Sequence, residues 1–100
     1  MNEITAHINQ IKRLCSQYRV KSLFAFGSAV KNKLTPESDI DFIVDIDATN
    51  PFDYSDNYFD LKFHLQKLFN RNIDLLEQKS LHNPFLKQEI DQSKLLVYGK

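Results

Sequence analysis

The segment from Asp39 to Asp47 constrains the fold of this chain most, because apolar and acidic residues alternate along it almost without a break. Successive side chains of a β-strand point to opposite faces of the sheet. One face of the predicted strand would therefore carry Ile40, Phe42, Val44 and Ile46, and the other would carry Asp39, Asp41, Ile43, Asp45 and Asp47. The pattern predicts a strand with one core face and one acidic face.

Helices and short strands are predicted on both sides of this strand. Apolar residues recur every three or four positions in three segments, which is typical of helices with one buried face. We expect helices at about 3–19, 56–70 and 80–93, the last interrupted or started near Pro84, and a short helix begun at Ser28. Further strands are expected at 22–26, 72–77 and 94–98, the last at an edge of the sheet. This order predicts an α/β (α+β) fold, a small mixed sheet backed by helices.

For the helices expected at 56–70 and 80–93, the sequence also predicts which side chains face the core. The segment from Ala48 to Ser55 is polar and contains Asn50-Pro51, so it is expected to be a loop before the helix at 56–70. The expected apolar stripe of that helix is Phe59, Leu61, Phe63, Leu65, Leu68 and Phe69. The expected apolar contacts of the last helix are Phe85, Leu86 and Ile90.

Length and charge exclude several classes of protein. The 100 residues predict a single domain spanning 1–100, which leaves no room for a separate substrate domain. Thirteen basic and thirteen acidic residues give no general attraction for a nucleic acid, so no direct nucleic-acid binding is expected. A lone cysteine, Cys15, and no apolar run of about eighteen residues favour a cytoplasmic protein without membrane contact.

A Gly-Ser turn follows the first predicted strand. Gly27 is the only glycine in the interior of the sequence, so an unusual backbone geometry is expected there. Ser28 would open a helix, and its hydroxyl with the backbone N–H groups that follow can bind a phosphate. A simple helix cap by Ser28 remains the alternative.

Asp39 and Asp41 project from the same face of the predicted strand, with Cα atoms roughly 6.6 Å apart. Two carboxylates at that spacing can hold one Mg²⁺ or a pair of ions and leave positions for phosphate oxygens. Asp45 would lie about 13 Å beyond Asp41, too far to share that ion. We interpret Asp45 and Asp47 as solvated residues at the end of the strand, a role that an isolated Asp-x-Asp pair could also have.

Other acidic motifs do not fit. An EF-hand loop counted from Asp39 needs glycine at its sixth position, where this chain has Val44. A P-loop needs Gly-Lys-Ser/Thr, which is absent from the sequence. Phosphatases of the haloacid dehalogenase type carry Asp-x-Asp but lack the upstream Gly-Ser and need a longer chain.

Gly27-Ser28, ten residues and then Asp39-Ile40-Asp41 resembles the motif of the polymerase-beta-like nucleotidyltransferase superfamily. Over about residues 3 to 98 the chain is similar to the minimal nucleotidyltransferases (MNT), the partners of HEPN-domain toxins. The resemblance implies two Mg²⁺ ions on Asp39 and Asp41 and a third carboxylate on a later strand. Asp74 matches that third position, where it would ligate the catalytic ion and act as the base.

The resemblance also implies that the triphosphate is gripped at Gly27 and Ser28. The family continues with x-Ala-Arg-Gly, whereas this chain has Ala29-Val30-Lys31-Asn32 and so lacks the Arg and the Gly. Lys31 or Lys33 could supply a positive charge there, without the bidentate geometry of Arg.

The expected activity is Mg²⁺-dependent transfer of AMP from ATP to a hydroxyl. The resemblance implies that this hydroxyl belongs to a tyrosine of a HEPN toxin and that the chain is an antitoxin. Two alternatives stay open: a weakly active or inactive module that neutralises its partner by contact, and a small-molecule enzyme similar to kanamycin nucleotidyltransferases. Either a homo-oligomer or a hetero-oligomer is compatible with the sequence.

Overall fold

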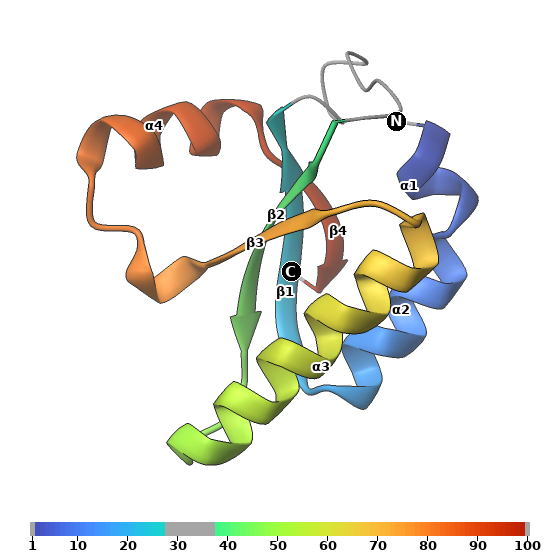
Figure 1. Cartoon of the computed structure of the whole chain (residues 1–100). Coiled ribbons are helices and arrows are strands. Elements are labelled where there is room, and N and C mark those ends of the chain that lie inside the picture. The colour runs from blue at the N-terminus through green and yellow to red at the C-terminus, as the bar shows by residue number, and fades with distance from the viewer. Residues whose placement is uncertain (1, 28–37, 100) are drawn as a thin grey trace.

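A four-stranded mixed sheet forms the centre of the molecule (Figure 1). The computed structural model describes residues 2–27 and 38–99. The strands are β1 (Val20–Phe26), β2 (Ile40–Ile46), β3 (Ile73–Glu77) and β4 (Leu95–Gly99), in the spatial order β3-β2-β1-β4. β1 is antiparallel to β2 and β4, and β2 is parallel to β3. The predicted mixed sheet is confirmed, with β4 at one edge as expected.

Helices cover both faces of the sheet unequally. They are α1 (Asn2–Ala6), α2 (Ile8–Gln17), α3 (Pro51–Phe69) and α4 (Pro84–Ser93), with a short 3-10 turn, η2 (Gln78–Ser80), after β3. Figure 1 shows α2 and α3 together on one side of the sheet and α4 apart from them. Within the described residues, no helix has both the length and the apolar character that a membrane span needs.

The first predicted helix is divided in two. We expected one helix over 3–19, but His7 leaves the helical conformation with φ −112° and ψ 16°. Its ring packs edge-on against Phe69 with 5.2 Å between ring centroids. Ile4 in α1 and Ile11 in α2 are both buried, with 2% and 0% of their surfaces exposed.

α3 begins at Pro51, within the segment that we expected to be a loop. The Asn50 side chain accepts a hydrogen bond from the Phe52 backbone N–H at 2.8 Å. Proline suits the first position of a helix, because its fixed φ is already helical and the N–H that it lacks would have no partner there. Asn50-Pro51 is therefore the start signal of a helix rather than a turn.

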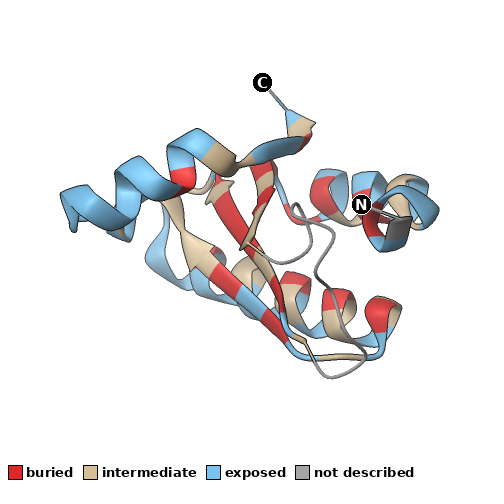
Figure 2. Ribbon diagram, turned by 90° about the horizontal axis from the view of Figure 1, so that it is seen from above, coloured by how far each residue is buried: buried red, intermediate tan, exposed pale blue. Residues whose placement is uncertain are grey.

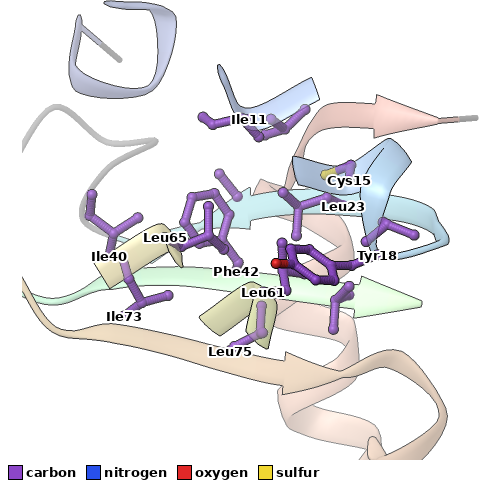
Figure 3. Packing of buried hydrophobic residues seen from close by; sticks show 14 of the residues in the cluster. Ile11, Cys15, Tyr18, Leu23, Ile40, Phe42, Leu61, Leu65, Ile73 and Leu75 are labelled. Atoms are coloured by element: carbon purple, nitrogen blue, oxygen red, sulfur yellow. The ribbon is translucent and has the colours of Figure 1, made fainter. Parts of the chain in front are cut away.

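The core lies between the sheet and the pair α2 and α3. Phe42 is fully buried in the middle of β2, and Figure 3 shows its ring between side chains of the strands and helices. Cys15 on α2 is also fully buried, and this burial raises the pKa of its thiol to about 12. The predicted core face of the central strand is confirmed, because its four members are all buried: Ile40, Phe42, Val44 and Ile46.

The predicted apolar stripes of α3 and α4 are partly wrong. Phe59 and Phe63 on α3 are 64% and 57% exposed, whereas Leu61, Leu65 and Phe69 are buried. Each residue turns a helix by about 100°, so Phe59 and Phe63 lie opposite Leu61. On α4, Ile90 is buried, but Phe85 and Leu86 are exposed. Figure 2 shows α4 as an almost wholly exposed helix.

Candidate active site

Asp41 is the second residue of β2, the strand that pairs with β1 on one side and with β3 on the other. It is opposite Phe26 of β1 in the antiparallel pair and opposite Asp74 of β3 in the parallel pair. Residues in register on neighbouring strands point to the same face of a sheet. The structure therefore brings Asp41 and Asp74 together, although they are 33 positions apart in the sequence. They share the sheet face opposite the one that carries Phe42.

Gly27 closes this site from the end of β1. Its φ is +73°, a conformation that residues with a Cβ rarely adopt. A Cβ at this position would also lie 2.6 Å from Oδ2 of Asp41. Glycine is therefore required at this position for two reasons: the backbone turn needs a positive φ, and the Asp41 carboxylate occupies the space that a Cβ would fill. The expected unusual geometry at Gly27 is confirmed.

The carboxylates of the site affect one another. Burial raises the pKa of Asp41, and the negative charges of Asp74 and Asp39 raise it further. A carboxylate that is half-buried beside two like charges is unfavourable unless a proton or a cation neutralises it. Carboxylate oxygens are the ligands that Mg²⁺ prefers, so the donor set fits such an ion.

Asp39 and Asp74 are exposed, and Asp39 lies just before the first residue of β2. Within residues 2–27 and 38–99, no three acidic, histidine or cysteine side chains are already close enough to hold a metal ion together. Asp41 with its register partner Asp74 is thus the preformed part of the predicted site. Asp39 contributes a negative charge that raises the pKa of Asp41.

Three predicted phosphate-binding residues, Ser28, Lys31 and Lys33, lie outside the described residues, as does the helix expected to begin at Ser28. Asp47 is exposed just after β2, as predicted for a solvated strand end. Asp45 is half-buried within β2, opposite Ser22 of β1. It is therefore part of the sheet rather than a freely solvated residue.

Arg71 is a positioning residue that the sequence did not reveal. Its Nη1 donates to the backbone oxygen of Ser38 at 3.0 Å, and its Nη2 forms an ion pair with Glu3 at 3.4 Å. The backbone N–H of Ile40 also donates to the Asn72 oxygen. These contacts fix the backbone on both sides of Asp39. A single arginine between two asparagines gives no pattern from which this role could be predicted.

Tyr58 of α3 fixes the backbone of β3 beside Asp74. Its hydroxyl donates to the Leu75 carbonyl oxygen at 2.5 Å. Burial raises the pKa of Tyr58, and the charges of Glu77 and Asp74 raise it further, so the hydroxyl keeps its proton. Because β3 is an edge strand with one strand neighbour, this bond from a helix helps to hold its position.

Tyr58→Phe is expected to destabilise the protein by about 1 kcal/mol, the usual contribution of one such hydrogen bond. It should also lower the rate of the reaction at this site several-fold without changing KM, because the position of Asp74 becomes less fixed. Denaturant unfolding and initial rates measure both effects. The control is Tyr18→Phe, since the Tyr18 hydroxyl has a long 3.4 Å contact with Gln17. Equal effects of both variants on the rate would contradict the assignment.

The four-stranded mixed sheet with its helices matches the polymerase-beta-like nucleotidyltransferase fold. The family model described as polymerase beta, nucleotidyltransferase matches residues 9–100, and the chain belongs to this family. It is 35% identical over 98 residues to a protein of Methanocaldococcus jannaschii named "Putative protein adenylyltransferase MJ1379", covering 97% of both chains. The resemblance stated from the motif is confirmed.

Two solved structures share the fold. A crystal structure of a toxin-antitoxin with AMP-PNP matches with a TM-score of 0.73 and 21% identity, covering 93% of this chain and 73% of that chain. The tri-AMPylated Shewanella oneidensis HEPN toxin in complex with MNT antitoxin matches with a TM-score of 0.67 and 19% identity, covering 97% and 73%. At this level of identity the likeness establishes the architecture.

Proposed function

We propose that this chain is a Mg²⁺-dependent protein adenylyltransferase that moves AMP from ATP to a tyrosine hydroxyl of a HEPN-domain toxin and so acts as its antitoxin. The observation that carries the proposal is the register of Asp41 and Asp74 beside Gly27. The adenylyltransferase name of the relative and the AMPylated HEPN toxin among the similar structures support it.

The proposed reaction is an in-line displacement at the α-phosphorus of ATP. The acceptor oxygen forms a bond to this phosphorus as the bond between the α-phosphorus and the bridging oxygen breaks, and pyrophosphate leaves with that oxygen. The proton of the acceptor hydroxyl goes to Asp74, which is exposed and can reach an incoming group. Positioning and charge neutralisation supply most of the rate in such reactions.

Asp39, Asp41 and Asp74 would hold the Mg²⁺, with two ions expected. When bound, the metal neutralises charge on the phosphates and lowers the pKa of an attacking hydroxyl. Gly27 leaves room for the Asp41 carboxylate at this site. We assign the triphosphate to Gly27, Ser28, Lys31 and Lys33.

The acceptor would come from the partner protein, with residues 1–100 acting as one catalytic unit. The equal numbers of basic and acidic residues favour a protein acceptor over a nucleic acid. The unpaired cysteine is compatible with a cytoplasmic location.

The test is to incubate the chain with Mg²⁺, ATP and the product of the adjacent reading frame, and then to map the modified residue by mass spectrometry. An adenylyl group on a tyrosine of the partner is expected. It should be absent with Asp39→Asn and when that tyrosine of the partner is replaced by Phe. A tight complex that neutralises the partner equally well with Asp39→Asn, and without any modification, would support the contact-only module instead.

A further inference from the structure

The exposed face of α3 carries a stripe of three phenylalanines, Phe52, Phe59 and Phe63, which are 81%, 64% and 57% exposed. We call these three residues the α3 stripe. Their spacing of seven and four residues places them on one side of the helix, over about 16 Å. Several large exposed apolar residues on one side of a helix are typical of an interaction surface rather than of a solvated helix face.

Acidic residues flank the stripe along one side. Asp53, Asp56 and Asp60 follow each other at spacings of three and four residues, and all three are exposed. At about 100° per residue they lie beside the stripe and away from the buried face of α3. The amino-terminal half of this surface is therefore apolar in the middle and negative along one margin. A partner that matches it is apolar with a positive margin.

The carboxyl-terminal end of the stripe borders a cavity that reaches Asp39 of the candidate active site. This cavity, of about 530 Å³, is lined by Phe63, Gln66 and Lys67 of α3, by Asn70, Arg71 and Asn72 after the helix, and by Asp39. Phe63 thus belongs both to the stripe and to the wall of the cavity. Lys67 also lies over the Phe63 ring, with its Nζ 5.4 Å from the ring centroid. Phe63 therefore connects the stripe to the cavity that contains Asp39.

We propose that the α3 stripe docks an amphipathic helix of the acceptor protein, with an apolar face and a basic margin, and that the docked segment presents the acceptor hydroxyl to the cavity beside Asp39. This inference rests on the proposed function. The spacing of the stripe is that of a seam between two helices, which favours a helix over an extended peptide. A second copy of this chain fits less well, because its stripe has the same acidic flank.

The first test measures the affinity of the chain for the product of the adjacent reading frame. Phe59→Ser with Phe63→Ser is expected to weaken the complex by at least about tenfold, as is usual for central aromatic residues of an interface. The matched control is Phe85→Ser on α4, which is 82% exposed and should change the affinity less than about twofold. Both variants should keep the far-UV circular dichroism spectrum and the cooperative denaturant unfolding of the unmodified chain, which shows that the fold is intact.

A second test uses the charges. Asp56→Lys with Asp60→Lys should slow association with the partner at low salt by about tenfold or more and weaken its salt dependence. Hydrogen exchange should show protection of residues 59–67 on binding. Protection confined to 84–93, or unchanged affinity in the phenylalanine double variant, would overturn the proposal. A shift from dimer to monomer in that variant, with partner binding unchanged, would instead identify an interface between copies and also overturn it.

These measurements separate the docking surface from the proposed reaction. If the unmodified chain binds the partner and the double variant does not, the docking surface is supported even when no adenylyl group is transferred. If transfer occurs at the same rate in the double variant, the reaction is supported and the docking surface is wrong.

Discussion

Asp41→Asn is expected to abolish nucleotidyl transfer and, at the same time, to raise the melting temperature of the metal-free protein. The loss of transfer should be at least about 10³-fold, because a metal ligand supports several kcal/mol of charge stabilisation and each 1.4 kcal/mol is tenfold in rate. The gain in stability follows from the raised pKa of Asp41, since its charged form is disfavoured in the folded chain. The gain should be small, because Asp41 is only half-buried.

The pH dependence of stability gives an independent check on Asp41. Its pKa is higher in the folded chain than in the unfolded one, so the folded state binds more protons between these two values. The free energy of unfolding should therefore fall as the pH rises from about 4, the value for an unperturbed aspartate, through the raised pKa. Asp41→Asn should remove this part of the slope. Chelator must be present, because Mg²⁺ stabilises the ionised site.

The control for Asp41→Asn is Asp47→Asn, an exposed change at the other end of β2. It should leave both transfer and melting temperature near those of the unmodified chain. A large fall in melting temperature with Asp41→Asn would mean that its carboxylate stabilises the fold. Transfer that survives this substitution would remove Asp41 from the catalytic site.

Gly27→Ala is expected to have the second largest effect. The left-handed backbone conformation costs a residue with a Cβ about 1–2 kcal/mol, and the new methyl group would collide with Oδ2 of Asp41. The Asp41 carboxylate must move to relieve the collision. A displacement of about 1 Å at a catalytic group can cost about 10²-fold in rate. Denaturant unfolding and initial rates of transfer measure the two effects.

A double variant separates the two costs of Gly27→Ala. In an Asp41→Ala background the carboxylate is absent, so only the backbone penalty should remain. The two substitutions should therefore couple by about 1 kcal/mol in stability, as is usual for residues in contact. Additive effects would mean that Gly27 and the Asp41 carboxylate do not contact each other in solution.

The strands could be predicted from the sequence better than the faces of the helices. The alternation at 39–47 and the short apolar pattern at 72–77 correspond to β2 and β3, because a period of two is distinctive. α3 has large apolar residues on both sides, Leu61 and Leu65 on one and Phe59 and Phe63 on the other. Helical periodicity shows that two such rows exist, but only the packing of α3 on the sheet determines which one is buried.

The site was predictable where it depends on local spacing. Asp39 and Asp41 follow from the strand pattern, and Asp74 was assigned through the family resemblance and then found in register with Asp41. The contact of Gly27 with Asp41 and the bond from Arg71 to Ser38 were not predictable. Both join elements that are distant in the sequence, so they depend on strand pairing and on how α3 ends beside β2.

The central claim is that this site transfers the α-phosphoryl group of ATP, with its nucleoside, to the partner protein. The most direct measurement compares ATP labelled at the α-phosphate with ATP labelled at the γ-phosphate, each incubated with the chain, Mg²⁺ and the product of the adjacent reading frame. The account predicts label on the partner from the α-phosphate alone, with release of pyrophosphate, and none with Asp41→Asn. Label from the γ-phosphate, or α-label that persists with Asp41→Asn, would contradict it.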